Sequence, residues 1–203
     1  MVGNYTVDET LPARVANAVD YFKHRLEYDE QLYESRTKAR RTSRTPVPTI
    51  GFCGHSRAGK DTAALYVSEI SQLTYPGSSS SYILPLLAHA VGVSPEQAMQ
   101  ERHNHSDFWL HFCNEFRRND PTRLVRRSLA HGDMVTGIRS DVELLECKKL
   151  GVLDVTVWIE NPRVQVDPTV EYPRQYCDLV IDNCGSKEEL FGKLLRFVNL
   201  LRM

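Results

Sequence analysis

A single segment organises this chain: Gly54-His55-Ser56-Arg57-Ala58-Gly59-Lys60-Asp61-Thr62. A short apolar run, residues 49–53, precedes it, and a helix-forming sequence, residues 63–67, follows it. A G-x-x-x-x-G-K motif between a strand and a helix is typical of a phosphate-binding loop, also called a Walker A motif or P-loop. Its glycines let backbone N–H groups converge on an anion, and the helix N-terminus adds partial positive charge. We therefore expect residues 54–62 to bind a nucleoside triphosphate, with Lys60 reaching the β- and γ-phosphates.

The residue after this lysine differs from the usual pattern. A serine or threonine that binds magnesium commonly stands there, whereas this chain has Asp61 followed by Thr62. A carboxylate is a good ligand for a hard cation. We therefore expect either that Asp61 binds Mg²⁺, directly or through water, or that Thr62 takes this role with a shift of one residue.

The composition is that of a globular protein. Of the 203 residues, 41% are hydrophobic and 25% are charged, which are ordinary fractions. No apolar run approaches the length of a membrane span, and the N-terminus lacks a signal-peptide pattern. The five cysteines form no C-x-x-C pair, which favours free thiols in a reducing compartment. We expect a cytoplasmic protein with no membrane partner, and a net charge of −1 gives it no overall attraction to nucleic acid.

Residues 1–45 are expected to lie outside the nucleotide-binding core, which we place at residues 46–203. Apolar residues in this first segment recur at intervals of three or four: Leu11, Val15, Val19, Phe22 and Leu26. This spacing predicts an amphipathic helix. Its apolar stripe must be buried either on the core or against a second copy of the chain, so a homodimer is one alternative.

The end of this first segment, residues 35–46, is strongly basic. It contains no acid and five cations: Arg36, Lys38, Arg40, Arg41 and Arg44. One interpretation is a solvated, flexible linker. The other is a basic arm that follows the phosphate backbone of a nucleic acid, because such binding releases counterions.

After the phosphate loop, we expect a short strand at residues 82–85 and then a helical insertion at about residues 86–131. Serine and proline signals at Ser94-Pro95 and a possible cap at Ser106-Asp107 mark helix starts within it. Three aromatic residues, Tyr82, Phe108 and Trp109, could stack on an extruded base. The alternative is that they belong to the hydrophobic core.

One polar cluster in the insertion comprises His103, His105, Asp107 and His111. These residues lack a recognised zinc-ligand spacing such as H-E-x-x-H. We therefore favour hydrogen bonding by the histidines over a structural zinc site. For Asp107 we expect a role in helix capping or in a pocket for a second substrate, the acceptor of a phosphoryl group. In that pocket, Asp107 is the best candidate for a general base.

A second set of residues in the insertion is a cluster of arginines: Arg117, Arg118, Arg123, Arg126 and Arg127. Arg123 and Arg127 are four residues apart and share one helix face. Arginine side chains neutralise transferring phosphoryl groups and bind phosphate in a bidentate manner. We expect Arg123 and Arg127 to contact the acceptor's phosphate, with a solvated surface position as the alternative for each.

The last third of the chain alternates strands and helices. Residues 134–138 read as a buried parallel strand with Arg139 at its carboxyl end, the edge where ligands bind in open α/β sheets. Further strands are expected at residues 155–159 and 177–183. The proline-rich segment 161–173 is either a lid-like loop, with Arg163 as a phosphate contact, or a surface connection.

Three sequence features resemble the phage deoxynucleoside monophosphate kinases: the G-K-D-T ending at Thr62, the strand that ends at Arg139, and the I-D-N sequence that ends at Asn183. The resemblance covers residues 49 to about 201. It implies ATP and Mg²⁺ as cofactors and places Asn183 near the adenine. The family's strand ends in Asp-x-Arg, but this chain has Gly137 in place of the acid. We therefore favour Asp61 as the magnesium ligand, with Asp133 and Asp141 as weaker candidates.

The resemblance implies a P-loop kinase, in which Lys60, Asp61 and Arg139 stabilise the transferred γ-phosphoryl group. The expected acceptor is the hydroxymethyl group of 5-hydroxymethyl-deoxyuridine in phage DNA, a step in thymine hypermodification in the infected bacterial cytoplasm. The basic arm, the lost acid and the aromatic residues favour this acceptor. The alternative is a free deoxynucleoside monophosphate, which would place the enzyme in deoxynucleotide metabolism.

Two further alternatives have less support. A nucleotide-switch ATPase is disfavoured because no second acidic motif and no water-positioning residue can be identified. A non-catalytic nucleic-acid module would leave Gly59 and Lys60 without a role. For the fold, alternating strand and helix signals predict an α/β P-loop NTPase architecture. It would have about five parallel strands flanked by helices, a central strand before the phosphate loop, and an N-terminal amphipathic helix.

Overall fold

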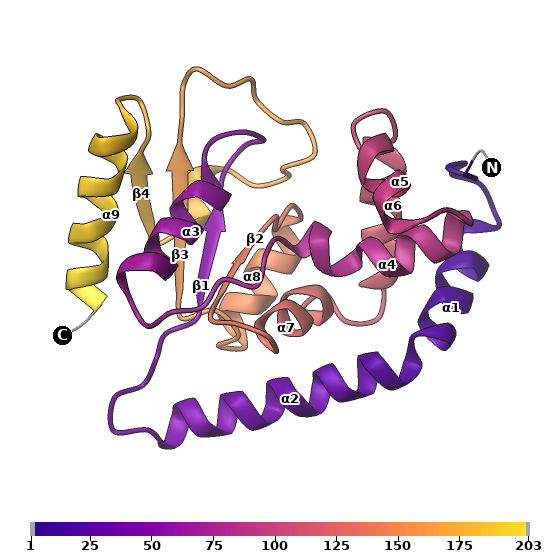
Figure 1. Cartoon of the computed structure of the whole chain (residues 1–203), viewed down its shortest axis with the longest axis horizontal. Helices are drawn as coiled ribbons and strands as arrows, with labels where there is room; N and C mark the ends of the chain where they lie inside the picture. Colours follow the sequence, from indigo (N-terminus) through magenta and orange to yellow (C-terminus); the bar gives the residue numbers. More distant parts are fainter. Residues whose placement is uncertain (1–2, 202–203) are drawn as a thin grey trace.

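The computed structural model describes residues 3–201. The first two residues of the predicted segment 1–45 and the last two of the predicted core 46–203 lie outside the described residues. The described chain forms an all-parallel four-stranded sheet in the order β2-β1-β3-β4, flanked by helices (Figure 1). The strands are β1 (Ile50–Cys53), β2 (Met134–Thr136), β3 (Val155–Glu160) and β4 (Leu179–Asp182). The α/β class and the internal position of β1 are therefore as predicted.

Both faces of the sheet are covered by helices. Ile50 and Phe52 of β1 pack in a cluster with α3 (Lys60–Ile70) and α9 (Lys187–Leu201). Cys53, whose side chain alternates to the other face, packs with α7 (Arg123–Leu129) and α8 (Asp141–Lys149). A parallel sheet that is buried on both faces needs apolar residues at successive positions, which explains the short apolar runs of the sequence.

A separate helical layer lies beside the sheet. It contains α1 (Leu11–Tyr21), α2 (Lys23–Thr42), α4 (Ser79–Val91), α5 (Pro95–Glu101) and α6 (Ser106–Phe116). Val15 and Leu26 of the predicted amphipathic stripe are buried in one cluster with Leu86 and Phe112. The stripe is therefore covered by the chain's own helices, although the predicted single helix is two helices that meet at Phe22. No helix among residues 3–201 has both the length and the apolar character needed to cross a lipid bilayer.

The strand predicted at residues 82–85 is wrong, because these residues lie within α4. Ser78 caps this helix by accepting a hydrogen bond from the backbone nitrogen of Ser81 at 3.2 Å. Tyr82, Ile83 and Leu86 then recur at helical spacing and are buried in the helical layer. Consequently, the sheet of the described chain has four strands, and the helical insertion begins at Ser79 instead of near residue 86.

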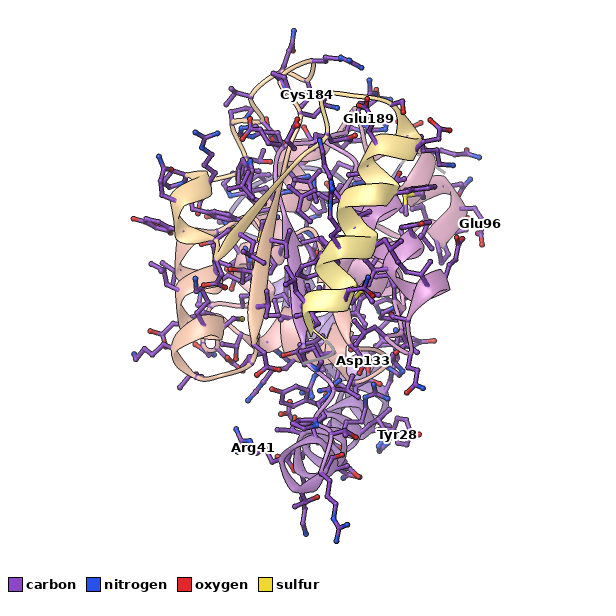
Figure 2. The ribbon with its side chains drawn as sticks, turned by 90° about the vertical axis from the view of Figure 1, so that its left-hand side faces the viewer. Tyr28, Arg41, Glu96, Asp133, Cys184 and Glu189 are labelled. Carbon is purple, nitrogen blue, oxygen red and sulfur yellow. The ribbon has the colours of Figure 1, made fainter. Side chains whose placement is uncertain are left out.

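The basic run is not a flexible linker over residues 35–42, because these residues are the last turns of α2. Arg36 Nη2 and Arg40 Nη2 lie 2.7 and 2.8 Å from Asp133 Oδ1, which precedes β2. Asp133 is at the amino-terminal edge of the sheet, and Figure 2 shows it beside α2, at the opposite end of the molecule from Cys184. Two of the five cations are thus neutralised within the chain.

Candidate functional site

The loop of residues 54–59, which we call the glycine loop, connects β1 to α3. Gly59 is the N-cap of α3 and has a φ of 101°, and a Cβ there would lie 2.6 Å from Nδ2 of Asn183. Only glycine fits this position without strain. Arg57 also has a positive φ of 61°, a conformation that costs a non-glycine residue energy and that is concentrated at functional sites. The loop thus delivers the chain to the N-terminus of α3, where backbone N–H groups favour an anion.

Lys60 lies across the glycine loop. Its Nζ donates a hydrogen bond to the carbonyl oxygen of His55 at 2.5 Å. Burial lowers the pKa of Lys60 to about 8, and the nearby Arg139 guanidinium adds to this effect, while Asp61 and Asp167 oppose it. An anion bound in the loop would therefore restore the stability of the charged lysine.

Asp61, on the first turn of α3, meets the carboxyl end of β2. Its Oδ1 accepts hydrogen bonds from the Tyr75 hydroxyl at 2.5 Å and from Thr136 Oγ1 at 2.6 Å. The two hydroxyl oxygens lie 2.8 Å apart. Thr62, the other predicted magnesium ligand, is exposed at the next position of α3. Sequence reasoning missed Tyr75 and Thr136, although the place of Thr136 at a strand end was an available signal.

Gly137 explains why β2 does not end in an acid. It has a φ of 88°, and a Cβ there would lie 2.5 Å from Oγ of Ser79. A side chain at this position would clash with the start of α4. The weaker candidates do not replace it: Asp133 is bound to arginines at the other edge of the sheet, and Asp141 Oδ1 accepts from the backbone of Val142 at 2.6 Å.

The segment of residues 161–173 lies against the glycine loop. Arg139, at the end of β2, pairs with the carboxylate of Asp167 and donates to Thr169. Burial raises the pKa of Asp167, but the hydrogen bond from Thr169 and the ion pair with Arg139 outweigh burial and hold it at about 2. The backbone nitrogen of Asp167 donates to Nδ1 of His55 at 3.2 Å. The segment is therefore placed as a lid would be.

Two other predicted residues have structural contacts near residues 161–173. Arg163 donates to the carbonyl oxygen of Cys184, after β4, so its contact is with the backbone there. Asn183 Nδ2 donates to the carbonyl oxygen of Ala58 at 2.9 Å. Asn183 thus braces the glycine loop from the end of β4, which is a role that sequence reasoning did not assign to it.

Arg123 and Arg127 are bound to other parts of the helical layer. Arg127, largely buried, pairs with Glu30 of α2. Arg123 donates to the carbonyl oxygen of Phe116 at 3.1 Å, and its guanidinium carbon lies 4.2 Å from the centroid of that ring. These contacts join α2, α6 and α7, so in this structure both arginines serve packing.

The histidine cluster and Asp107 do not converge. The His105 ring stacks on Tyr5 with centroids 4.0 Å apart, and Asp107 is exposed at the start of α6. The cap predicted at Ser106-Asp107 is wrong, because His105 is the N-cap and makes no side-chain cap hydrogen bond. Within residues 3–201, no group of three or more His, Cys, Asp or Glu side chains is arranged to hold a metal ion.

Arg102, the C-cap of α5, lies close enough to Arg139, Asp61 and Asp167 for their charges to act on it, and sequence reasoning missed it. It donates to Oγ of Ser80 at 2.9 Å, and its guanidinium carbon lies 5.3 Å from the centroid of the Trp109 ring. Burial lowers its pKa, the charge of Arg139 adds to this lowering, and the charges of Asp61 and Asp167 act in the opposite direction. No pattern in the sequence separated it from the other arginines of the insertion.

The three aromatic residues expected to stack on a base are core residues instead. Tyr82, Phe108 and Trp109 are only 8%, 2% and 5% exposed.

Comparison with models of known protein families finds no match, and no curated protein is significantly similar to this chain. Support for a function therefore comes from the residues of the site.

Proposed function

We propose that this protein is an ATP-dependent nucleotide kinase in which the glycine loop is a P-loop. The observation that carries this proposal is the convergence of Gly59, the α3 N-terminus and a half-buried Lys60 at the carboxyl edge of a parallel sheet. Backbone N–H groups and a lysine with few polar partners form a site for phosphate groups. A glycine turn that served only to begin a helix would not need a half-buried, charged side chain lying across it.

The proposed roles follow from position. Lys60 binds the β- and γ-phosphates, and Arg139 neutralises charge on the transferred phosphoryl group when it exchanges Asp167 for phosphate. The donor set at Asp61, one carboxylate near two hydroxyls, suits Mg²⁺, which takes one or two carboxylates together with waters and substrate phosphates. Asp61 would hold this ion, which supplies charge neutralisation at the phosphate oxygens.

For the acceptor, we favour a free deoxynucleoside monophosphate over a base in DNA. Two of the three features that favoured DNA lose their force. The aromatic residues are buried, and the basic run lies at the amino-terminal edge of the sheet with Arg36 and Arg40 paired to Asp133. The glycine loop lies at the opposite edge, where a small acceptor needs no basic arm (Figure 1).

A second candidate acceptor is 5-hydroxymethyl-deoxyuridine in DNA. One observation favours it: Lys38, Arg41 and Arg44 are exposed on α2 and just beyond it. These three cations could contact a DNA backbone whose modified base enters the site at the far edge. A switch ATPase is less well supported, because it would need a second, acidic motif at the end of β2. This chain has Gly137 at that position.

The test is transfer of label from γ-labelled ATP to acceptors offered in parallel. These are the four deoxynucleoside monophosphates, duplex DNA containing 5-hydroxymethyluracil, and the same duplex with thymine. Label in a monophosphate supports the first acceptor, and label in the modified duplex alone supports the second. Release of labelled phosphate with no labelled acceptor would contradict a kinase and favour an ATPase.

A further inference from the structure

The carboxylate of Asp61 is held by two hydroxyls from different parts of the chain. Tyr75 lies in the connection after α3, and Thr136 is the last residue of β2. Their hydroxyl oxygens lie 2.5 and 2.6 Å from the same atom, Oδ1. Asp61 itself is exposed, so Oδ2 is the oxygen that an ion from solvent can reach.

This arrangement is more than helix capping. Asp61 is in the first turn of α3, yet its side chain is bonded to groups 14 and 75 residues away. Thr136 is only 1% exposed, and Tyr75 is half-buried. Two partly or fully buried donors on one oxygen fix the orientation of an exposed carboxylate, which solvent alone would leave free to rotate.

We infer that Tyr75 and Thr136 are positioning residues that aim Oδ2 of Asp61 at Mg²⁺, an inference that rests on the proposed function. In the usual pattern, the residue after the loop's lysine supplies a hydroxyl and the strand end supplies an acid. Here Asp61, after Lys60 in the first turn of α3, supplies the acid, and Thr136 at the strand end supplies a hydroxyl. The two kinds of group have therefore exchanged elements. An acid at position 137 could not restore the usual pattern, because Ser79 occupies the space that its Cβ would need.

The test is Mn²⁺ binding to the full chain in the presence of ADP. Electron paramagnetic resonance measures this binding as the loss of the signal of free Mn²⁺. The variants Thr136→Val and Tyr75→Phe each remove one hydroxyl with little change in shape. Each is expected to weaken Mn²⁺ binding by about tenfold, the lower end of the effect of such supporting groups. ADP affinity measured without metal should change by less than about twofold, because neither hydroxyl is placed in the glycine loop.

Two further variants separate positioning from folding. Thr136→Ser retains the hydroxyl and should bind Mn²⁺ like the wild type. Thr156→Val is a matched control, since Thr156 is also a buried strand threonine whose Oγ1 donates to a carboxylate, that of Asp178, at 2.7 Å. It should leave Mn²⁺ binding unchanged.

The outcomes distinguish the inference from the proposed function. If the wild type binds neither ADP nor Mn²⁺, the proposed function fails. If the wild type binds both, and Thr136→Val and Tyr75→Phe bind Mn²⁺ as tightly as Thr156→Val does, the function stands and the positioning role is overturned.

Discussion

The backbone nitrogen of Asp167 lies 3.2 Å from Nδ1 of His55, so the segment of residues 161–173 rests directly on the glycine loop. The carboxylate of the same residue pairs with Arg139. Arg139 is therefore neutralised by Asp167 in this arrangement. A phosphate group that enters the site must compete with this carboxylate for the guanidinium.

Replacement of Asp167 by asparagine is expected to strengthen ATP binding by about fivefold. The amide cannot neutralise Arg139, so a phosphate no longer displaces a carboxylate. Titration calorimetry measures the affinity, and Asp178→Asn, which removes a carboxylate paired with Lys148, is the control. Weaker ATP binding by Asp167→Asn would show that the contact of residues 161–173 with the glycine loop matters more than the competition for Arg139.

ATP binding near pH 8 is expected to be coupled to proton uptake. The pKa of Lys60 is about 8, so about half of the molecules lack this proton at pH 8 and about a tenth lack it at pH 7. Phosphate groups stabilise the ammonium, so binding should take up about half a proton at pH 8. Calorimetry in two buffers with different ionisation enthalpies measures this uptake. An equal uptake at both pH values would contradict the assignment.

Arg102 and Arg123 offer a matched comparison in the helical layer. Each lies over an aromatic ring and donates one hydrogen bond to a neighbouring oxygen. They differ in surroundings, since Arg139 and Asp61 act on Arg102, while Arg127 and Asp120 act on Arg123.

Arg102→Met should raise the KM for the acceptor by about tenfold or more and leave the KM for ATP nearly unchanged, because the guanidinium belongs to the helical layer, where we expect the acceptor, and is acted on by the charges of Arg139 and Asp61. Arg123→Met should lower the melting temperature with little effect on either KM. Steady-state kinetics and thermal denaturation separate the two. If both variants changed only stability, Arg102 would have no role in the site.

Asp133 anchors the basic end of α2, and its replacement by asparagine should destabilise the protein. The residue is 6% exposed and lies between Arg36, Arg40 and Thr74. Its replacement leaves Arg36 and Arg40 without a carboxylate partner, and Arg40 keeps only its hydrogen bond to the carbonyl oxygen of Gly132, at a cost of about 3 kcal/mol. Urea denaturation at pH 7 measures this loss, and Glu34→Gln, an exposed position on the same helix, is the control.

The destabilisation should also depend on pH. Burial raises the pKa of Asp133, but its hydrogen bonds with Arg40 and Thr74 and the charge of Arg36 outweigh burial and lower it. Its contribution is therefore present above the unfolded value of about 3.9 and is lost as the pH falls through the lower folded value. The difference between wild type and Asp133→Asn should shrink below about pH 4. A constant difference down to pH 2 would contradict this assignment.

The parts of the fold that could be predicted are those with local signals. The glycine loop, β1 and the alternation of strands and helices after Gly132 follow from short-range patterns. The apolar run at Tyr82–Leu84 had no such signal, because a short apolar run fits a buried helix as well as a strand. The capping contact at Ser78 and the packing against α1 decide for the helix.

Within the candidate site, the sequence predicted the strand, loop and helix around Lys60 but not the long-range contacts of this segment. Arg36 and Arg40 meet Asp133 across more than ninety residues, and the contact between Thr136 and Asp61 spans 75. No periodicity reports such pairs. For the same reason Arg123 looked like Arg102 in the sequence, and only the three-dimensional neighbours of each distinguish a packing role from a place in the site.

Equilibrium binding of ATP with Mg²⁺ to the wild type and to Lys60→Met tests the central claim most directly. The wild type should bind, and Lys60→Met should bind at least about a hundredfold more weakly, because the half-buried ammonium across the glycine loop is lost. Lys193→Met removes a lysine paired with Asp182 and should bind like the wild type. If Lys60→Met, still folded, bound ATP as tightly as Lys193→Met, the glycine loop would not be the nucleotide site.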